Sequence, residues 1–334
     1  MNNSTITTYY PLSNYNEGQI AFDILLLVFI LVPVIAANIL ILVTLVCESK
    51  VYTVIRLMLD NIPIACIIES LGHMMLRISA LVIGINRIYH PPDFLCSFSI
   101  FMVTLGGIGR IMYMATFSVT VFLVVKIGKD RLHYKYFIPA VICIWVFVFL
   151  IAGQNLIEAV VSVEYSFGFI CRPKNDLNAK NYVVVVLLFL FAYFLPLLVT
   201  VACILKVYHF VKKKIVADKM AVSKSMTKFA IFLIVGNTTN VLANSITIGT
   251  LLLSRKEQYE EFGYNVAIAI LYFDTVVAHL ALIPSCILII NYFKPLRKRI
   301  KHYMLTFFMT CLLKKKPLNS MYPSQDLNPS VIKA

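Results

Sequence analysis

The chain has 334 residues, of which 60% are hydrophobic and only 14% are charged. Soluble domains carry roughly 25% charged residues, so this composition excludes an ordinary water-soluble globular protein. The net charge of +14 does not indicate a nucleic-acid partner, because the basic residues lie between long apolar runs. Many of these runs exceed the roughly 18 residues that a membrane-spanning helix needs. We therefore expect a multi-pass membrane protein.

Seven apolar segments predict the architecture. Within a bilayer the backbone N–H and C=O groups must be paired inside their own segment, so each run is expected to be an α-helix and no strand is required. The predicted spans are residues 20–47, 56–85, 96–126, 136–158, 182–211, 227–253 and 264–292. The predicted fold class is an all-α integral membrane protein, with a seven-transmembrane helix bundle over residues 20–292. Prolines within these runs are expected to form kinks or helix starts.

Basic residues are unevenly divided between the two sides of the predicted membrane. Four segments hold 22 of the 30 lysines and arginines, namely residues 48–56, 126–135, 206–228 and 294–334. The positive-inside rule makes these segments cytoplasmic, as is the C-terminus, and places the N-terminus outside, with the plasma membrane as the expected location. The extracellular tail, residues 1–19, contains no lysine or arginine and carries overlapping N-glycosylation sequons at Asn2 and Asn3.

The chain after the seventh span is expected to lie in the cytoplasm. Residues 293–309 alternate basic and apolar side chains at helical spacing, which predicts a short amphipathic helix on the membrane lipids. Residues 310–334 are polar and rich in proline, and we expect a disordered tail. Cys311 has the juxtamembrane setting of a palmitoylation site.

The second predicted span carries one polar stripe on an otherwise apolar helix. Its members recur at positions i, i+3, i+7 and i+11 and are Cys66, Glu69, His73 and Arg77. This spacing places all of them on one helix face, which we expect to point into the bundle. Ionisable groups inside a membrane usually face the bundle interior and have partners.

Arg110 in the third span is the clearest intramembrane charge. Glycines that permit close helix approach flank it at Gly106, Gly107 and Gly109. We expect Glu69 to pair with Arg110, and Asp274 of the seventh span is the next candidate partner. The sequence leaves open whether such a pair switches between states or is only structural.

Other spans add polar residues. The sixth span has a polar face formed by Asn237, Asn240, Asn244 and Thr247. This face is expected to pack against neighbouring helices, and only Asn244 and Thr247, nearer the outer end, are candidate ligand contacts. The predicted intramembrane polar network consists of Asn38, Cys66, Glu69, Arg110, Asp274 and His279.

Several landmark residues recur in an order and spacing typical of one receptor family. They are Asn38 in the first span, Asn61-Ile-Pro-Ile-Ala in the second, Cys96 at the start of the third, Trp145 in the fourth, Cys171 in the next loop, Pro196 in the fifth and Pro284 in the seventh. On these residues the chain resembles a divergent rhodopsin-like (class A) G-protein-coupled receptor over residues 20–305. The resemblance implies a disulfide bond between Cys96 and Cys171, an extracellular ligand, and a heterotrimeric G protein as the cytoplasmic partner.

The chain also departs from the pattern of that family. Counted in the family's frame, Cys66 replaces the usual aspartate of helix two and Arg110 replaces the helix-three serine that faces it. The family's sodium site has therefore lost a carboxylate and gained a cation, for which Glu69 would be the counter-ion. The usual Asp-Arg-Tyr, which the resemblance places toward the G protein, is replaced by Thr120-Val121-Phe122. The usual Asn-Pro-x-x-Tyr is replaced by Ile283-Pro284-Ser285-Cys286-Ile287.

The resemblance further implies a ligand pocket in the outer half of the bundle. Its helix-three floor would consist of Val103, Thr104 and Gly107. Amine receptors of the family have an aspartate where Val103 stands, which disfavours a biogenic amine. Residues 264–292 contain no lysine, so no retinal Schiff base can form and no cofactor is expected. Arg77 could instead offer a positive charge to an acidic ligand.

Other classes of protein remain as alternatives. A seven-helix channel or transporter would use Glu69, Arg110, Asp274 and His279 as its pathway, although no internal repeat is found. A receptor-like partner subunit that does not couple to a G protein is compatible with the missing Asp-Arg-Tyr. No catalytic motif is found and the histidines are scattered, so we expect neither an enzyme nor a metal site. The favoured interpretation is a receptor for a chemosensory or peptide-like ligand.

Overall fold

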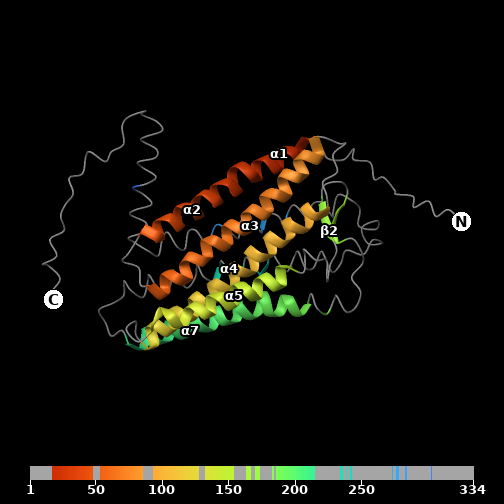
Figure 1. Cartoon of the computed structure of the whole chain (residues 1–334). Coiled ribbons are helices and arrows are strands. Elements are labelled where there is room, and N and C mark those ends of the chain that lie inside the picture. Colours follow the sequence, from red (N-terminus) through yellow and green to blue (C-terminus); the bar gives the residue numbers. More distant parts are fainter. Residues whose placement is uncertain are drawn as a thin grey trace.

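The computed structural model describes residues 17–47, 53–85, 93–127, 132–153, 163–166, 170–173, 183 and 186–214, together with isolated helical residues between 234 and 302. The elements in this part of the chain are α1 (Glu17–Leu26), η2 (Leu27–Leu31), α2 (Val32–Cys47), α3 (Thr53–Ile85), α4 (Asp93–Ile127), η4 (Tyr134–Tyr136), α5 (Phe137–Gly153), β1 (Val163–Ser166), β2 (Ile170–Pro173), η5 (Leu190–Phe194) and α7 (Leu195–Lys214). The long helices lie side by side in one bundle, with α4 in contact with α3, α5 and α7 (Figure 1).

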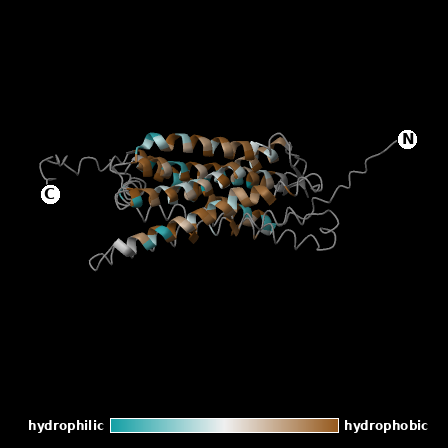
Figure 2. Cartoon of the chain, turned by 90° about the horizontal axis from the view of Figure 1, so that it is seen from below, coloured by the Kyte–Doolittle hydropathy of each residue, from teal (hydrophilic) through white to brown (hydrophobic). Residues whose placement is uncertain are grey.

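The first five predicted spans each coincide with helix in the structure. Four helical segments are long and apolar enough to cross a membrane, namely Glu17–Val46, Phe94–Ile127, Tyr134–Gly153 and Val186–Phe210. Helix α3 is just as long but carries the polar stripe, which lowers its hydropathy. Apolar residues cover most of the described helices (Figure 2), as expected of a helical membrane protein. The predicted spans 227–253 and 264–292 lie outside the described residues except for isolated positions.

Two prolines are preceded by a widened turn of helix. The π-helical segments η2 and η5 each end two residues before a proline, Pro33 and Pro196 respectively. A proline removes one N–H donor and its ring clashes with the carbonyl one turn earlier, and a π-helical turn gives that carbonyl room. Pro139 lies in the first turn of α5, where the missing N–H costs nothing. These positions agree with the expected kinks and helix starts.

Helices α3 and α4 touch along their backbones. A Cβ atom added at Gly106 would overlap the Glu69 backbone nitrogen and would lie 2.6 Å from the carbonyl oxygen of Ala65. A Cβ atom at Gly72 would lie 2.7 Å from the backbone nitrogen of Val103. Glycine is therefore required on both sides of this contact, because any side chain would push the two helices apart.

The interior consists of two apolar clusters that both include α4. One cluster joins α2, α3, α4 and α7 and contains Leu45, Leu59, Tyr113 and Phe117 among its members. The other joins α4, α5 and η5 and contains Phe101, Ile108 and Tyr193 among its members. Arg110 lies on α4 between residues of the two clusters, so the ionisable pair described below is enclosed by apolar side chains.

A short antiparallel hairpin lies between α5 and α7. In the described residues β1 pairs with β2, with Val163 opposite Pro173 and Tyr165 opposite Cys171. The described spans are helical, as expected, and this hairpin lies in the loop between two of them. The hairpin contacts α4 and lies beside its first residues (Figure 1). We call this end of the bundle the hairpin end, and the opposite end, with Lys126, Lys135 and Lys206, the basic end.

Candidate functional site

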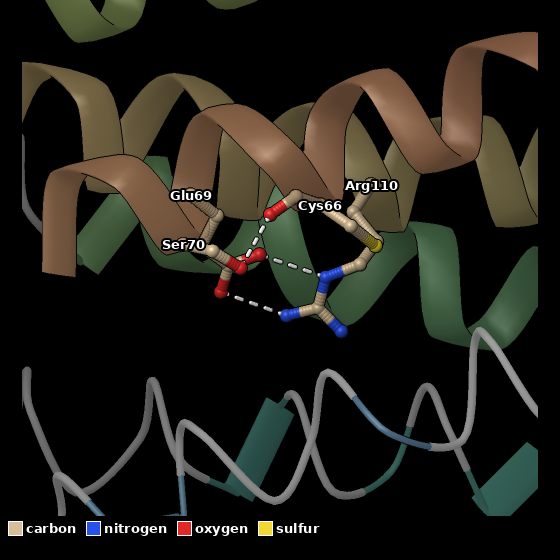
Figure 3. Close-up of polar contacts among 4 residues, drawn as sticks. All are labelled: Cys66, Glu69, Ser70 and Arg110. Carbon is tan, nitrogen blue, oxygen red and sulfur yellow. Dashed lines mark hydrogen bonds and ion pairs between the residues drawn. The ribbon is translucent and has the colours of Figure 1, made fainter. Parts of the chain in front are cut away.

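A buried ion pair joins the centres of α3 and α4. Arg110 donates from Nε to Glu69 Oε2 and from Nη2 to Glu69 Oε1, with both distances 2.8 Å (Figure 3). Glu69 is 4% exposed and Arg110 is 1% exposed. Each residue stands at the midpoint of its helix. The predicted pairing is confirmed, and its two parallel bonds are the strongest geometry available to an arginine and a carboxylate.

The glycines beside Arg110 have three different neighbours. Gly106 brings α4 against the backbone of α3, as described above. A Cβ atom at Gly107 would lie 3.6 Å from Glu69 Oε1, which is an ordinary contact, so Gly107 borders the carboxylate. A Cβ atom at Gly109 would lie 3.5 Å from the ring of Trp145. The expected role of close helix approach therefore belongs to Gly106, whereas Gly107 and Gly109 face side chains.

The polar stripe of α3 faces the interior as predicted. Cys66 is fully buried, and the hydroxyl of Ser70 donates to its carbonyl oxygen at 2.7 Å (Figure 3). His73, one turn from Glu69 toward the hairpin end, is 9% exposed. Polar groups thus continue from the ion pair toward the hairpin end.

A second ion pair occupies the hairpin-end part of the stripe. Arg77 Nη1 donates to Asp23 Oδ1 of α1 at 3.1 Å, and Asp23 is 1% exposed. Sequence reasoning did not single out Asp23, although the signal was present, because it is a lone carboxylate inside the first apolar run and needs a partner. Arg77 was expected to offer its charge to an acidic ligand. That role stays a prediction, and the structure shows that an internal carboxylate already binds the guanidinium.

Tyr193 brings a third helix to the central pair. It lies in η5, is buried, and is close enough to Glu69 and Arg110 to interact electrostatically with both. The sequence gave no signal for this contact, because the π-helical turn before Pro196 sets which residues of that helix face inward. The ion pair therefore joins α3 to α4 and lies within electrostatic range of the helix that continues into α7.

Two of the landmark residues, Asn61 and Trp145, are joined by a hydrogen bond between α3 and α5. The indole nitrogen Nε1 of Trp145 donates to Asn61 Oδ1 at 2.8 Å, which joins α5 to α3. The hydroxyl of Tyr113 donates to the carbonyl oxygen of Val141 at 3.0 Å, and its ring lies 5.4 Å from that of Trp145. Asn38 is buried and donates to the carbonyl oxygen of Val34 at 2.8 Å.

The residues expected to line the ligand pocket and those expected to face the G protein differ in their burial. Val103 and Thr104 are partly exposed on α4. Thr120 is fully buried and its hydroxyl donates to the carbonyl oxygen of Thr116 at 2.8 Å. Val121 is also buried, which leaves Phe122 as the most accessible of the three residues expected to face a G protein. That expectation stays a prediction.

Cys96 lies near the start of α4, where it is fully buried and disulfide-bonded. Its partner's side chain lies outside the described part of the chain, so pairing with Cys171 stays a prediction.

Other predicted residues also lie outside the described positions, namely Asn2, Asn3, Asn244, Thr247, Asp274, His279 and Cys311. Among the described residues no three histidine, cysteine, aspartate or glutamate side chains are grouped so as to hold a metal ion.

Comparison with models of protein families and with curated proteins finds no match to this chain.

Proposed function

We propose that this chain is a rhodopsin-like receptor of the plasma membrane, not an enzyme. It binds an extracellular ligand of chemosensory or peptide-like class and transmits the signal to a cytoplasmic heterotrimeric G protein. In this proposal the chain has seven spans, a glycosylated N-terminus outside the cell, and a disulfide bond between Cys96 and Cys171. The basic end faces the cytoplasm, because basic residues are retained on that side of a membrane.

The observation that carries this proposal is the Glu69–Arg110 pair. The resemblance implies a sodium ion held between helices two and three, at the positions of Cys66 and Arg110. The chain has a guanidinium at the second of these positions, and Glu69, one turn from Cys66, neutralises it with two hydrogen bonds. A covalently attached cation thus stands near where the family uses an exchangeable one. The hydrogen bond between Asn61 and Trp145, two landmark residues, gives further support.

The pair has the properties of a latch between helices. Separating two buried charges leaves each without a counter-ion in a low-dielectric interior, which is far more costly than keeping them together. A ligand shifts such a latch only if it binds one helix arrangement better than the other. Tyr193 supports this idea, because it interacts electrostatically with both charges from a third helical segment.

The experiment that tests the proposal is G-protein activation by the surface-expressed chain without ligand, across a panel of Gα subunits. The reference is an equally expressed chain truncated after residue 292. We expect activity above this reference, and several-fold more in Glu69→Gln, in which the latch is neutralised on one side. Ser70→Ala is the matched control, because Ser70 is buried on the same helix and its hydroxyl donates to Cys66 of that helix. Silence of both the wild type and Glu69→Gln at verified surface expression contradicts coupling and favours a non-coupling partner subunit.

A channel or transporter is the second candidate function. The observation in its favour is a series of largely buried polar groups between the hairpin end and the bundle centre, with an ion pair at each end of the series. Its members are Asp23, Arg77, His73, Glu69 and Arg110. Intramembrane ionisable groups in such a series are typical of ion and proton pathways. Whole-cell current that depends on Glu69 would support this candidate over the receptor.

A further inference from the structure

An aromatic ring at the basic end lies beside two lysines from different helices. Lys126, in the last turn of α4, has its Nζ atom 5.7 Å from the centroid of the Phe122 ring. Lys206 of α7 has its Nζ atom 6.0 Å from the same centroid. Both distances are within the range of cation–π attraction. One ring therefore gathers two ammonium groups that would otherwise repel each other.

Packing of the surrounding residues fixes this arrangement. Phe122 packs against an apolar cluster that includes Val121 of its own helix. Ile204 and Val207, on either side of Lys206, are buried in the same cluster. The backbones that carry both lysines are thus held in place, while the lysine side chains themselves are exposed. Two exposed cations beside one ring, carried on backbones that are held in place, form a site for an anion, because an anion offsets their repulsion.

Neighbouring side chains identify the environment of this site. Leu205 and Tyr208 are exposed beside Lys206, and Ile127 is exposed beside Lys126. Exposed apolar and tyrosine side chains next to lysines at the end of an apolar helix are typical of a membrane–water interface. The helices that carry them, α4 and α7, both belong to segments long and apolar enough to span a membrane. These neighbours favour a ligand with a charged head and an apolar tail.

We propose that Phe122, Lys126 and Lys206 form a binding site for the phosphate-bearing headgroup of an anionic phospholipid in the leaflet at the basic end. The two ammonium groups bind phosphate oxygens, and the exposed apolar residues beside them contact the acyl chains. Polybasic groups at a helix end are attracted to anionic lipid in this way. This site does not depend on the receptor proposal, because it requires neither a ligand pocket nor a G protein.

The test is native mass spectrometry of the full chain in a non-ionic detergent, titrated with phosphatidylinositol bisphosphate or with phosphatidylcholine. We expect preferential binding of the anionic lipid, weakened on the order of tenfold by Lys126→Gln with Lys206→Gln. Phe122→Leu should weaken it about threefold, because the lysines lose the ring that gathers them. Both lysines are exposed, so their substitution should not impair folding.

Lys135→Gln is the matched control, because it removes one exposed charge from the same end, on η4 rather than on α4 or α7. It should leave lipid affinity within about twofold of wild type. An equal loss in Lys135→Gln would mean diffuse attraction and would overturn the site. Equal binding of soluble inositol trisphosphate, with the same dependence on both lysines, would make it a free-anion site. Retained lipid affinity with lost binding of a polyglutamate peptide would assign the lysines to a protein partner instead.

Discussion

The two ion pairs that join α3 to α1 and α4 share the same chemistry but differ in how the fold encloses them. Glu69 and Arg110 meet through two bonds of 2.8 Å at the centre of two helices whose backbones touch. Asp23 and Arg77 are joined by a hydrogen bond of 3.1 Å nearer the hairpin end, and the Arg77 side chain is 19% exposed. The geometry and burial of the first pair hold both of its side chains in place, whereas the arginine of the second pair is partly exposed at the protein surface. Depth and helix contact, not residue type, separate a rigid pair from an adjustable one.

Removal of one central charge should have the largest effect. Glu69→Gln and Arg110→Gln should each lower the free energy of unfolding by about 3–5 kcal/mol, because each leaves a buried charge without its partner. The measurement is unfolding of the purified chain by detergent titration, with surface expression as a second readout. A loss below about 1 kcal/mol in both variants would mean that water reaches the site and that the pair is not locked.

The helix contact that encloses the central pair gives the next largest effect. Gly106→Ala should destabilise the bundle by about 1–3 kcal/mol, because its methyl group meets the α3 backbone, which cannot move independently. Gly107→Ala is the matched control, since its methyl group has ordinary contact distances. Thermal unfolding of the two variants side by side measures the difference. Equal stability of Gly106→Ala and Gly107→Ala would show that the backbones of α3 and α4 do not touch at Gly106.

Breaking the pair at the hairpin end should cost less. Asp23→Asn is expected to reduce the free energy of unfolding by about 1–2 kcal/mol, because Arg77 can turn its guanidinium toward water or lipid headgroups. Unfolding of this variant by the same detergent titration measures the loss. A loss as large as that of Glu69→Gln would remove the contrast between the two pairs.

The neutral hydrogen bond between Trp145 and Asn61 of α3 should give the smallest loss of stability. Trp145→Phe removes the indole donor to Asn61 while keeping an aromatic ring beside Tyr113. We expect a loss of about 1 kcal/mol, the usual value for one neutral hydrogen bond. Unfolding of Trp145→Phe and of the double variant with Asn61→Leu checks it, since the double variant should lose little more. A larger additional loss would assign Asn61 a separate partner.

The sequence predicted the features that depend on one helix at a time, and one pairing between two helices. Hydropathy located the first five spans, and helical spacing placed Cys66, Glu69 and His73 on one buried face. The partner of Glu69 could be predicted because a mid-membrane charge needs a counter-ion and Arg110 was near the same depth.

Features that depend on how helices rotate against each other could not be predicted in this way. Asp23 was overlooked because spacing within α3 says nothing about the face that α1 presents. Tyr193 lies in the π-helical segment η5 before Pro196, and a π-helical turn changes which residues of a helix point inward. The hairpin of β1 and β2 lies in a loop with no hydropathy pattern to indicate a strand.

The most direct test of the account is a double-mutant cycle on Glu69 and Arg110, read as the free energy of unfolding and as ligand-free G-protein activation. We predict that Glu69→Gln with Arg110→Gln regains most of the stability lost in either single variant, with a coupling energy of at least about 2 kcal/mol. We also predict that the double variant keeps the raised activity of Glu69→Gln, because its latch is absent. Additive losses of stability, or activation at the wild-type level in all three variants, would contradict the claim that this pair holds α3 to α4 as a switch.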